Sequence, residues 1–416
     1  MIRKPFLMLL LLCTGVSWGA TAEPPADLPD AQAALAALDN HPQVRAAQAR
    51  LRAARAEHDR LRAGSHEYAL RLNAQRRDVA GGPNRNEWET AIERGLRLPD
   101  KALLDDRIGA EGVQEAEERV GDARHEAARQ LLTLWYAALQ AQAEARLWQE
   151  QVALLETEER IVHTRVKSGD AARMQALQAT AAIAQAISQL EKAQARARTA
   201  LAELGGQFPE LPPPVESGAE PILPAGDEAH WLAMTLTHNH ELLAAQRAAE
   251  RVRLQARRAA AERRPDPVLG LRYASEQGGD ERVLGLSLSI ALPGEGRRAA
   301  GSVYAAEADA LMEMEASVRR RLTTEAAANW LRVSGAVESY RRMAQAAEAA
   351  GRHADVTRRA HELGEVGLSE VLLAQRVALE TRVSAAQARL AANEAIARLL
   401  LDAHLLWLPG REDGHH

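Results

Sequence analysis

The stretch "GEVGLSEVLLAQ", from Gly364 to Gln375, interrupts a long run of residues that otherwise has the composition of continuous helix. A second stretch, "GDAARMQALQA" from Gly169 to Ala179, stands in the same context 195 residues earlier. Glycine just after a helix favours the left-handed conformation that ends it. The sequence therefore predicts two long helical hairpins, each folded at a glycine turn, at residues 168–172 and 363–368.

Proline is missing from the intervals that flank these turns, and its absence predicts long helices because proline removes a backbone donor. In the first half, helices are expected from about Asp30 to Ala63, from Lys101 to Lys167, and from the glycine turn to about Leu204. At 1.5 Å per residue the middle helix is about 100 Å long. We expect the two shorter helices, of about 34 residues each, to lie end to end alongside it.

The second half of the chain repeats the plan of the first. "THNHELLAAQ" (237–246) echoes "DNHPQVRAAQ" (39–48), and "IALPGEG" (290–296) echoes "LRLPDK" (96–101). We interpret the chain as an internal duplication. The predicted divisions are a signal peptide at 1–22, a first repeat at 23–204, a Pro- and Gly-rich linker at 205–227, a second repeat at 228–408 and a tail at 409–416.

Between the short and the long helix of each repeat, the hydrophobic pattern changes to a period of two. Leu284, Leu286 and Leu288 alternate with small or polar residues, and the first repeat has a weaker alternation around Tyr68. These patterns predict β-hairpins at residues 66–98 and 267–293. Four strands cannot close a barrel wide enough to hold anything, but they could close one jointly with other copies.

The first residues predict an exported protein. Arg3 and Lys4 precede a short apolar run, and small residues at positions 20–22 fit a cleavage site. The apolar run is shorter than the roughly 20 residues that span a bilayer. The chain's single cysteine, Cys13, lies in this signal; lipidation there is a competing idea, although Leu11-Leu12 precede it where small residues are expected. The mature chain then has no disulfide.

The rest of the sequence points away from catalysis and nucleic-acid binding. The net charge is -5, with both signs interspersed along the helices, and the chain has no G-x-S-x-G, Walker A or H-E-x-x-H motif. His353 and His361 are eight residues apart, outside the i, i+4 spacing of a helical metal site. His238 and His240 flank Asn239, where helix capping is the simpler account. We therefore expect no enzyme, no cofactor and no bound metal.

Taken together, these features resemble the TolC-type outer-membrane efflux channels. The resemblance covers about Asp30 to Leu408. It rests on the duplicated order of helix, β-hairpin, long helix, glycine turn and helix, and on "NHPQVRAAQ", "HNHELLAAQ" and "GEVGLSEVLLAQ". The "LRLPDK" and "LPGEGRR" stretches before the long helices are more similar to the outer components of heavy-metal exporters than to those of drug exporters.

The resemblance implies a mainly α-helical protein with a membrane β-barrel. Three copies would form a 12-stranded β-barrel in the outer membrane of a Gram-negative bacterium, above a 12-helix α-barrel in the periplasm, with the linker as an equatorial belt. The trimer would be a passive exit duct of a tripartite efflux system, surrounded by outer-membrane lipid. A periplasmic adaptor would couple it to an inner-membrane pump.

The resemblance also implies roles for particular residues. The hairpin tips at Gly169, Asp170, Gly364 and Glu365 would dock the adaptor. Glu370 matches the position of acidic residues that ring the tunnel mouth, whereas Leu373 replaces a second acid found in some relatives, and Gln175 is its uncharged equivalent in the first repeat. Membrane-interface aromatics are expected at three positions: Tyr68, Trp88 and Tyr273.

Several alternatives remain open from the sequence. The cargo could be heavy-metal cations, drugs or, in type I secretion, a protein. A periplasmic adaptor is also exported and has a long helical hairpin, but it has one hairpin flanked by small β-domains, where this chain has two. A structural coiled-coil protein would leave the β-hairpins unexplained.

Overall fold

The computed structural model describes residues 23–78 and 80–407. The predicted signal peptide at 1–22, with Cys13, and the predicted tail at 409–416, with His415-His416, lie outside these residues.

The described chain contains the same order of elements twice. The first part contains α1 (Ala31–Asn40), α2 (Pro42–Ala63), β1 (Tyr68–Arg77), β2 (Arg85–Gly95), α3 (Pro99–Ser168) and α4 (Arg173–Gln207). The second contains α5 (Glu228–Thr237), α6 (His240–Ala261), β3 (Val268–Glu276), the 3-10 turn η1 (Gln277–Gly279), β4 (Glu281–Ser289), α7 (Glu295–Glu362) and α8 (Leu368–Asp402).

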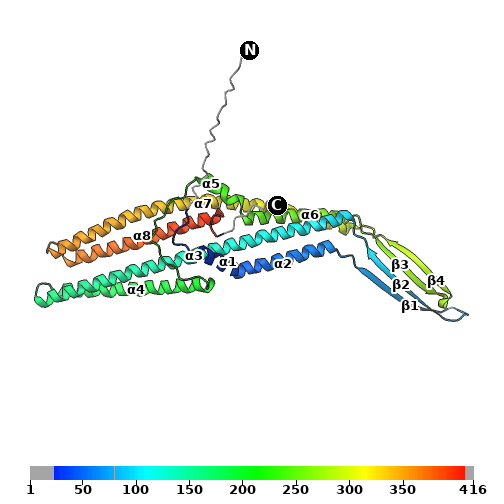
Figure 1. Ribbon diagram of the computed structural model, residues 1–416, viewed down its shortest axis with the longest axis horizontal. Helices are drawn as coiled ribbons and strands as arrows, with labels where there is room; N and C mark the ends of the chain where they lie inside the picture. Colours follow the sequence, from blue (N-terminus) through cyan, green and yellow to red (C-terminus); the bar gives the residue numbers. More distant parts are fainter. Residues whose placement is uncertain (1–22, 79, 408–416) are drawn as a thin grey trace, which may run out of the picture.

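The molecule is elongated, with the sheet at one end and the two glycine turns at the other (Figure 1). The 70 residues of α3 make a helix of about 105 Å. Helices α2 and α4 lie alongside different parts of α3, and α6 and α8 lie alongside α7 in the same way. Helix α3 also contacts α6 and α8, so it joins the two parts of the chain.

The main hydrophobic core lies near the middle of the length, away from both ends. Helix α3 contributes Leu131, Leu132 and Tyr136, and α8 contributes Leu399 and Leu400, all almost completely buried. Nearer the glycine turns, two smaller clusters combine alanines with larger side chains, among them Val152, Leu155 and Leu368. The core therefore fixes the middle of the molecule more firmly than the two ends.

The four strands form one antiparallel sheet in the order β1-β2-β3-β4. Both predicted hairpins are confirmed, and the central pairing joins β2 to β3, with Trp88 opposite Ser275. Strand β4 ends at Ser289, four residues before the predicted boundary at 293. Its last partner is Val268, and the preceding Pro267 has no N–H to continue the ladder.

The prediction of one helix from Asp30 to Ala63 is wrong. The backbone leaves the helical conformation at His41, where ψ is 134°, and α1 and α2 are separate helices. Proline disfavours the helical conformation in the residue before it, and Pro42 itself suits the first position of a helix. Helix α2 is consequently 22 residues long, not about 34.

The start of the linker also differs from the prediction. Helix α4 continues through Gly205 and Gly206 to Gln207, so the non-helical chain begins at Phe208 and not at 205. The N–H of Phe208 still bonds to the carbonyl of Leu204 at 2.8 Å, and its side chain is buried in the core. Burial of Phe208 thus holds two glycines in a last helical turn that their propensity alone disfavours.

Candidate functional site

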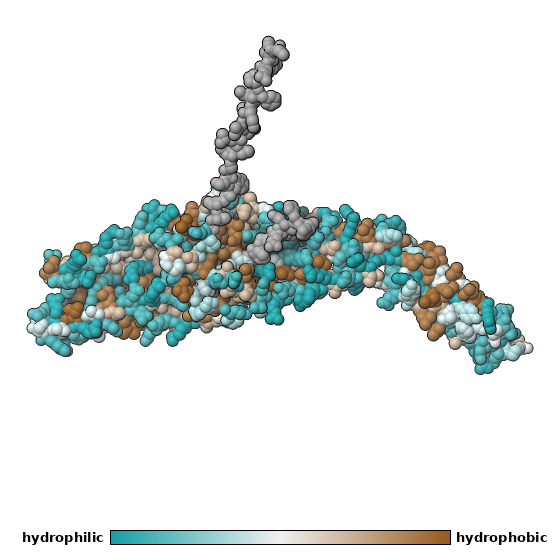
Figure 2. Space-filling view, in the orientation of Figure 1, coloured by the Kyte–Doolittle hydropathy of each residue, from teal (hydrophilic) through white to brown (hydrophobic). Residues whose placement is uncertain are grey.

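One face of the sheet is apolar and exposed. The strand register places Leu70, Ile92, Leu271 and Leu286 in one row across the four strands. These side chains are 45% to 89% exposed. Figure 2 shows hydrophobic residues gathered over the sheet, between the helices and a more polar outer end. A contiguous apolar patch of this kind marks a surface that contacts an apolar partner.

The opposite face of the sheet is polar. Arg71 forms an ion pair with Glu93 at 3.1 Å, and Arg272 forms one with Glu89 at 3.0 Å. Glu87 is 4% exposed and accepts a hydrogen bond from Gln75 and another from Arg77. Alternation between an apolar and a polar face along each strand is typical of strands with lipid on one side and water on the other.

The three predicted interface aromatics all lie on the apolar face. Trp88 and Tyr273 form a tilted pair with ring centroids 5.5 Å apart, toward the outer end. Tyr68 lies at the end next to the helices, where the Arg94 guanidinium is 4.6 Å from its ring centroid and donates a 3.0 Å hydrogen bond to its hydroxyl. The aromatic side chains therefore stand near both borders of the apolar surface.

Both edges of the sheet are open in the single chain. Among the described strands, β1 and β4 each pair on one side only. They are 10 and 9 residues long and contain no proline. Long edge strands with unpaired backbone groups and no proline are templates for pairing with another chain.

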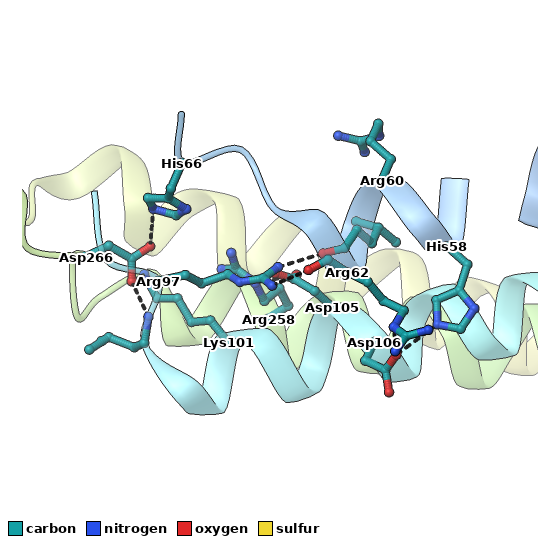
Figure 3. Close-up of polar contacts among 12 residues, drawn as sticks. His58, Arg60, Arg62, His66, Arg97, Lys101, Asp105, Asp106, Arg258 and Asp266 are labelled. Carbon is teal, nitrogen blue, oxygen red and sulfur yellow. Dashed lines mark hydrogen bonds and ion pairs between the residues drawn. The ribbon is translucent and has the colours of Figure 1, made fainter. Parts of the chain in front are cut away.

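A buried ion-pair network holds the sheet to the helices (Figure 3). Lys101, near the start of α3, is fully buried, and its Nζ lies 3.1 Å from Asp266 Oδ1 and 3.2 Å from Glu262 Oε2. Burial alone would raise the pKa of Asp266, but hydrogen bonds from the Leu98 N–H and from Lys101 outweigh it and lower the pKa. Lys101 thus binds the start of one long helix to the segment that precedes β3.

A second carboxylate in this network, Asp105, is shared by two arginines. Arg97 donates to it at 3.1 Å and Arg258 at 2.7 Å. Arg97 also donates 2.6 Å hydrogen bonds to the carbonyls of Leu61 and Arg62 near the end of α2. The network therefore connects α2, α3 and α6 where the helices meet the sheet.

Four histidines gather near the middle of the molecule, a cluster that their spacing in the sequence does not predict. The His404 ring centroid lies 5.2 Å from that of His240, 5.6 Å from that of His125 and 6.3 Å from that of His238. Burial lowers the pKa of His125 to about 3 and that of His404 to about 4. Within residues 23–78 and 80–407, no group of three or more His, Cys, Asp or Glu side chains is arranged to hold a metal ion.

The non-helical linker binds both halves of the helical body. Glu216 accepts hydrogen bonds from Arg146 of α3 and from Arg389 of α8. The neighbouring Ser217 donates its backbone N–H to Asp27 at 2.6 Å. Its composition identified this segment as a linker but did not reveal that its carboxylate connects two helices.

The glycine turns have the predicted geometry. Gly169 has φ 86° and Gly364 has φ 82°, and neither has another atom within 4 Å of the position that a Cβ would take. Asp170 and Glu365, the exposed residues that follow, donate backbone hydrogen bonds of 2.8 and 2.9 Å to carbonyls in the last helical turn. Glycine is thus required by the left-handed backbone and not by crowding.

Glu370 lies in the first turn of α8 and is exposed. Its Oε2 stands over Gly367, 2.8 Å from the position of an added Cβ. Leu373 and Val377, on the same side of the helix, are 53% and 41% exposed. Gln175, its predicted equivalent in the first part, is half-buried. A single chain does not test whether Glu370 forms a ring, so its role stays a prediction.

Between the linker and the tips, polar contacts join α8 to α3 and α4. Burial raises the pKa of Glu158, although a hydrogen bond from the buried amide of Gln375 partly offsets this. Three such contacts link the two helical hairpins: Arg382–Glu150 at 2.8 Å, Gln178–Ser369 at 3.2 Å and Gln375–Glu158.

None of the helices that the structure describes has an apolar stretch of the length that a membrane crossing needs.

Comparison with known proteins gives the same picture of the fold. The sequence matches no protein-family model and no curated protein. Among solved structures, a membrane protein of Pseudomonas aeruginosa matches with a TM-score of 0.78 and 17% identity, over 94% of this chain and 93% of that one. CusC, in a study of transmembrane channel formation, matches with a TM-score of 0.76 and 16% identity, over 92% and 98%.

A third match is the open state of the MtrE outer membrane channel of Neisseria gonorrhoeae. Its TM-score is 0.69 and its identity 19%, over 92% of this chain and 91% of that one. These matches cover both the long helices and the sheet, and at such identities they establish the architecture. The chain has the fold of the TolC-type outer-membrane channels.

Proposed function

We propose that three copies of this chain form a passive exit duct in the outer membrane of a Gram-negative bacterium. The observation that carries this proposal is the four-stranded sheet, which has one exposed apolar face, one polar face and two open edges. A sheet of four strands cannot close on itself around a channel. The open edges have unpaired backbone groups that another strand can pair with, and the apolar face can be covered by lipid. Symmetric copies in a lipid bilayer provide both kinds of partner.

The strand directions suit this closure. All neighbours in the sheet are antiparallel, so β1 and β4 run in opposite directions. Strand β4 of one copy can therefore pair with β1 of the next and continue the antiparallel pattern. Three copies give a closed barrel of twelve strands, an even number as in bacterial outer-membrane barrels. The polar face then lines the channel.

The helices extend the duct into the periplasm. We propose that the repeats at 23–204 and 228–408 each supply one helical hairpin to a 12-helix tunnel, with the linker as a belt around its middle. The tip turns at Gly169, Asp170, Gly364 and Glu365 would meet the helical hairpin of a periplasmic adaptor by helix-on-helix packing. The adaptor would connect the duct to an inner-membrane pump.

For the cargo, we propose heavy-metal cations. The support is the similarity of "LRLPDK" and "LPGEGRR" to the corresponding segments of heavy-metal exporters, together with the exposed acid at Glu370 near one tip. Drug efflux and type I secretion are the competing cargo classes.

The channel is tested by purifying the full chain from outer membranes in mild detergent. Unheated samples should migrate in gels as a trimer that boiling converts to monomer, and single trimers in planar bilayers should conduct ions. A monomer that neither resists mild heating nor conducts would contradict the proposal and favour a periplasmic adaptor or a structural coiled-coil protein.

The cargo is tested by growth of a deletion strain on divalent metals, bile salts, dyes and antibiotics. Sensitivity confined to metals such as zinc, cobalt, cadmium or copper would support metal export. Broad sensitivity to amphiphilic drugs would contradict it and favour general drug efflux. The absence of any sensitivity would contradict both and favour secretion of a peptide or protein.

A further inference from the structure

The apolar face of the sheet carries arginines but no carboxylates. The strand register assigns every strand residue to one face or the other. The charged strand residues of the apolar face are Arg76, Arg94 and Arg282. Those of the polar face are Arg71, Arg77, Arg85, Arg272, Glu87, Glu89, Glu93, Glu276 and Glu281. The two faces therefore differ in charge sign as well as in hydropathy.

The three arginines stand at the borders of the apolar surface. Arg94 shares the row of Tyr68, next to the helices. Arg282 lies at the opposite border, in the row of Trp88, and Arg76 lies one row farther out, opposite Asn86. Along β2, the eight residue steps from Arg94 to Asn86 span about 26 Å. Strands of membrane barrels are tilted, so the height of this segment along the membrane normal is less than its length along the strand. The apolar bands of membrane barrels, with which this height is compared, are about 25 Å tall.

The two outer arginines differ from the arginines of the polar face in their protein partners. Arg71, Arg77 and Arg272 form ion pairs with glutamates, and Arg85 binds the side chain of Gln277. In the described part of the chain, neither Arg76 nor Arg282 has a carboxylate within 4 Å. Both are exposed, and Arg76 lies 2.7 Å from the side-chain amide of Asn84, which in turn lies 2.6 Å from the Asp78 carboxylate. Asp78 and Asp280 lie outside the strands, in the connecting turns.

Resting on the proposed membrane function, we propose that Arg76 and Arg282 bind the phosphates of lipid head groups in the leaflet farther from the helices. Guanidinium groups bind phosphate in a bidentate manner, and each of these lies above an apolar surface that acyl chains would cover. Trp88 and Tyr273 belong to the same border, where aromatic rings sit at the level of head groups. The partner is thus a phosphorylated lipid, held by its chains and its phosphate together.

The test measures how much lipid stays bound to the detergent-purified trimer. The probes are a bis-phosphorylated lipid A, its dephosphorylated form, and inorganic phosphate as competitor, with retention read by native mass spectrometry. The variant carries Arg76→Gln and Arg282→Gln. The matched control is Arg71→Gln. It removes an arginine from β1, the strand that also carries Arg76, but from the opposite face of the sheet.

Loss of both arginines should reduce retention of the phosphorylated lipid about tenfold, since two charge-assisted contacts are lost. The Arg71 control should retain as much as wild type. Dephosphorylated lipid should bind to the wild-type protein no better than it binds to the double variant. Inorganic phosphate should not displace the phosphorylated lipid at equal concentration. Equal retention by wild type and double variant, or displacement by phosphate alone, would overturn the proposal.

Bilayer conductance of the same wild-type preparation separates this inference from the proposed function. A conducting trimer whose lipid retention is insensitive to the two arginines refutes only the head-group site. A wild-type protein that neither trimerises nor conducts refutes the proposed channel, and the head-group site with it.

Discussion

Asp27 and Asn393 are 366 residues apart in the sequence, and a 2.9 Å hydrogen bond joins them in the buried middle of the molecule. Asp27 is 1% exposed and Asn393 2%. The same carboxylate accepts the backbone N–H of Ser217, and the Asp27 carbonyl accepts the indole N–H of Trp135 at 2.6 Å. One residue near the start of the described chain thus joins the linker, α3 and α8.

Replacement of Asn393 by alanine should therefore destabilise the fold. A buried carboxylate oxygen of Asp27 would lose this donor, at a cost of about 1–3 kcal/mol. Gln387→Ala, at an exposed site on the same helix, should change stability by less than about 0.5 kcal/mol. Thermal unfolding of the purified variants compares the two, and equal effects would show that the hydrogen bond is not structural.

Lys101→Met should be among the most destabilising single changes at the junction of helices and sheet. It leaves Asp266 and Glu262 without their buried cation, and breaking a buried pair in this way costs about 3–5 kcal/mol. Arg264→Met removes an arginine that pairs with Asp100 at the surface, and should cost about 0–1 kcal/mol. If unfolding experiments ranked the two variants in the reverse order, the buried network would not hold the sheet to the helices.

A charged substitution should impair membrane insertion when it lies on the apolar face of β4 and should be tolerated when it lies on the polar face. Leu286→Arg places a charge on the apolar face, at a side chain that is 89% exposed, and should cost about 2–4 kcal/mol in a bilayer. Ser287→Arg, one residue along, places the same charge on the polar face. Recovery of heat-resistant trimer from outer membranes should fall for the first and persist for the second. Similar recovery of both would argue against lipid on the apolar face.

The buried histidine His125 should make stability fall in acid. Its pKa is lowered from 6.5 to about 3, by burial first and then by the charges of Arg129, His404 and His240. As the pH falls from about 6.5 toward 3, His125 binds a proton in the unfolded chain but not in the folded protein. Each such histidine then removes up to about 1.4 kcal/mol per pH unit.

His125→Gln should therefore make the free energy of unfolding fall less steeply between pH 6 and pH 5. The slope should decrease by up to the contribution of one proton, as measured by unfolding at several pH values. His163→Gln, at a half-exposed site on the same helix, serves as the control. An unchanged pH slope in the His125 variant would mean that this imidazole is accessible to protons in the folded protein.

Glu370→Gln should weaken cation selectivity if three copies of this residue ring the mouth of the duct. Removal of three charges from a constriction should lower the ratio of cation to anion permeability about twofold. Reversal potentials across a salt gradient measure that ratio. Glu348→Gln changes a surface glutamate on α7 that pairs with Arg352 and should leave the ratio unchanged. Equal permeability ratios in the wild type and the two variants would show that Glu370 does not line the pore.

The amino-acid sequence by itself determined the elements that depend on neighbouring residues. The left-handed turns at Gly169 and Gly364 follow from local backbone preference, and the two hairpins follow from alternation along each strand. The break at His41 belongs to the same class, since Pro42 dictates it, but the helical pattern on both sides hid it.

Only the tertiary structure decided which distant groups meet. The pairing of β2 with β3, the burial of Lys101, the hydrogen bond between Asp27 and Asn393 and the histidines around His404 all depend on how shorter helices align along α3, which is about 105 Å long. A shift of one residue along a strand would exchange its apolar and polar faces, and a shift along a helix would separate these partners. Periodicity selects a face for each element, whereas packing against the other elements selects its register.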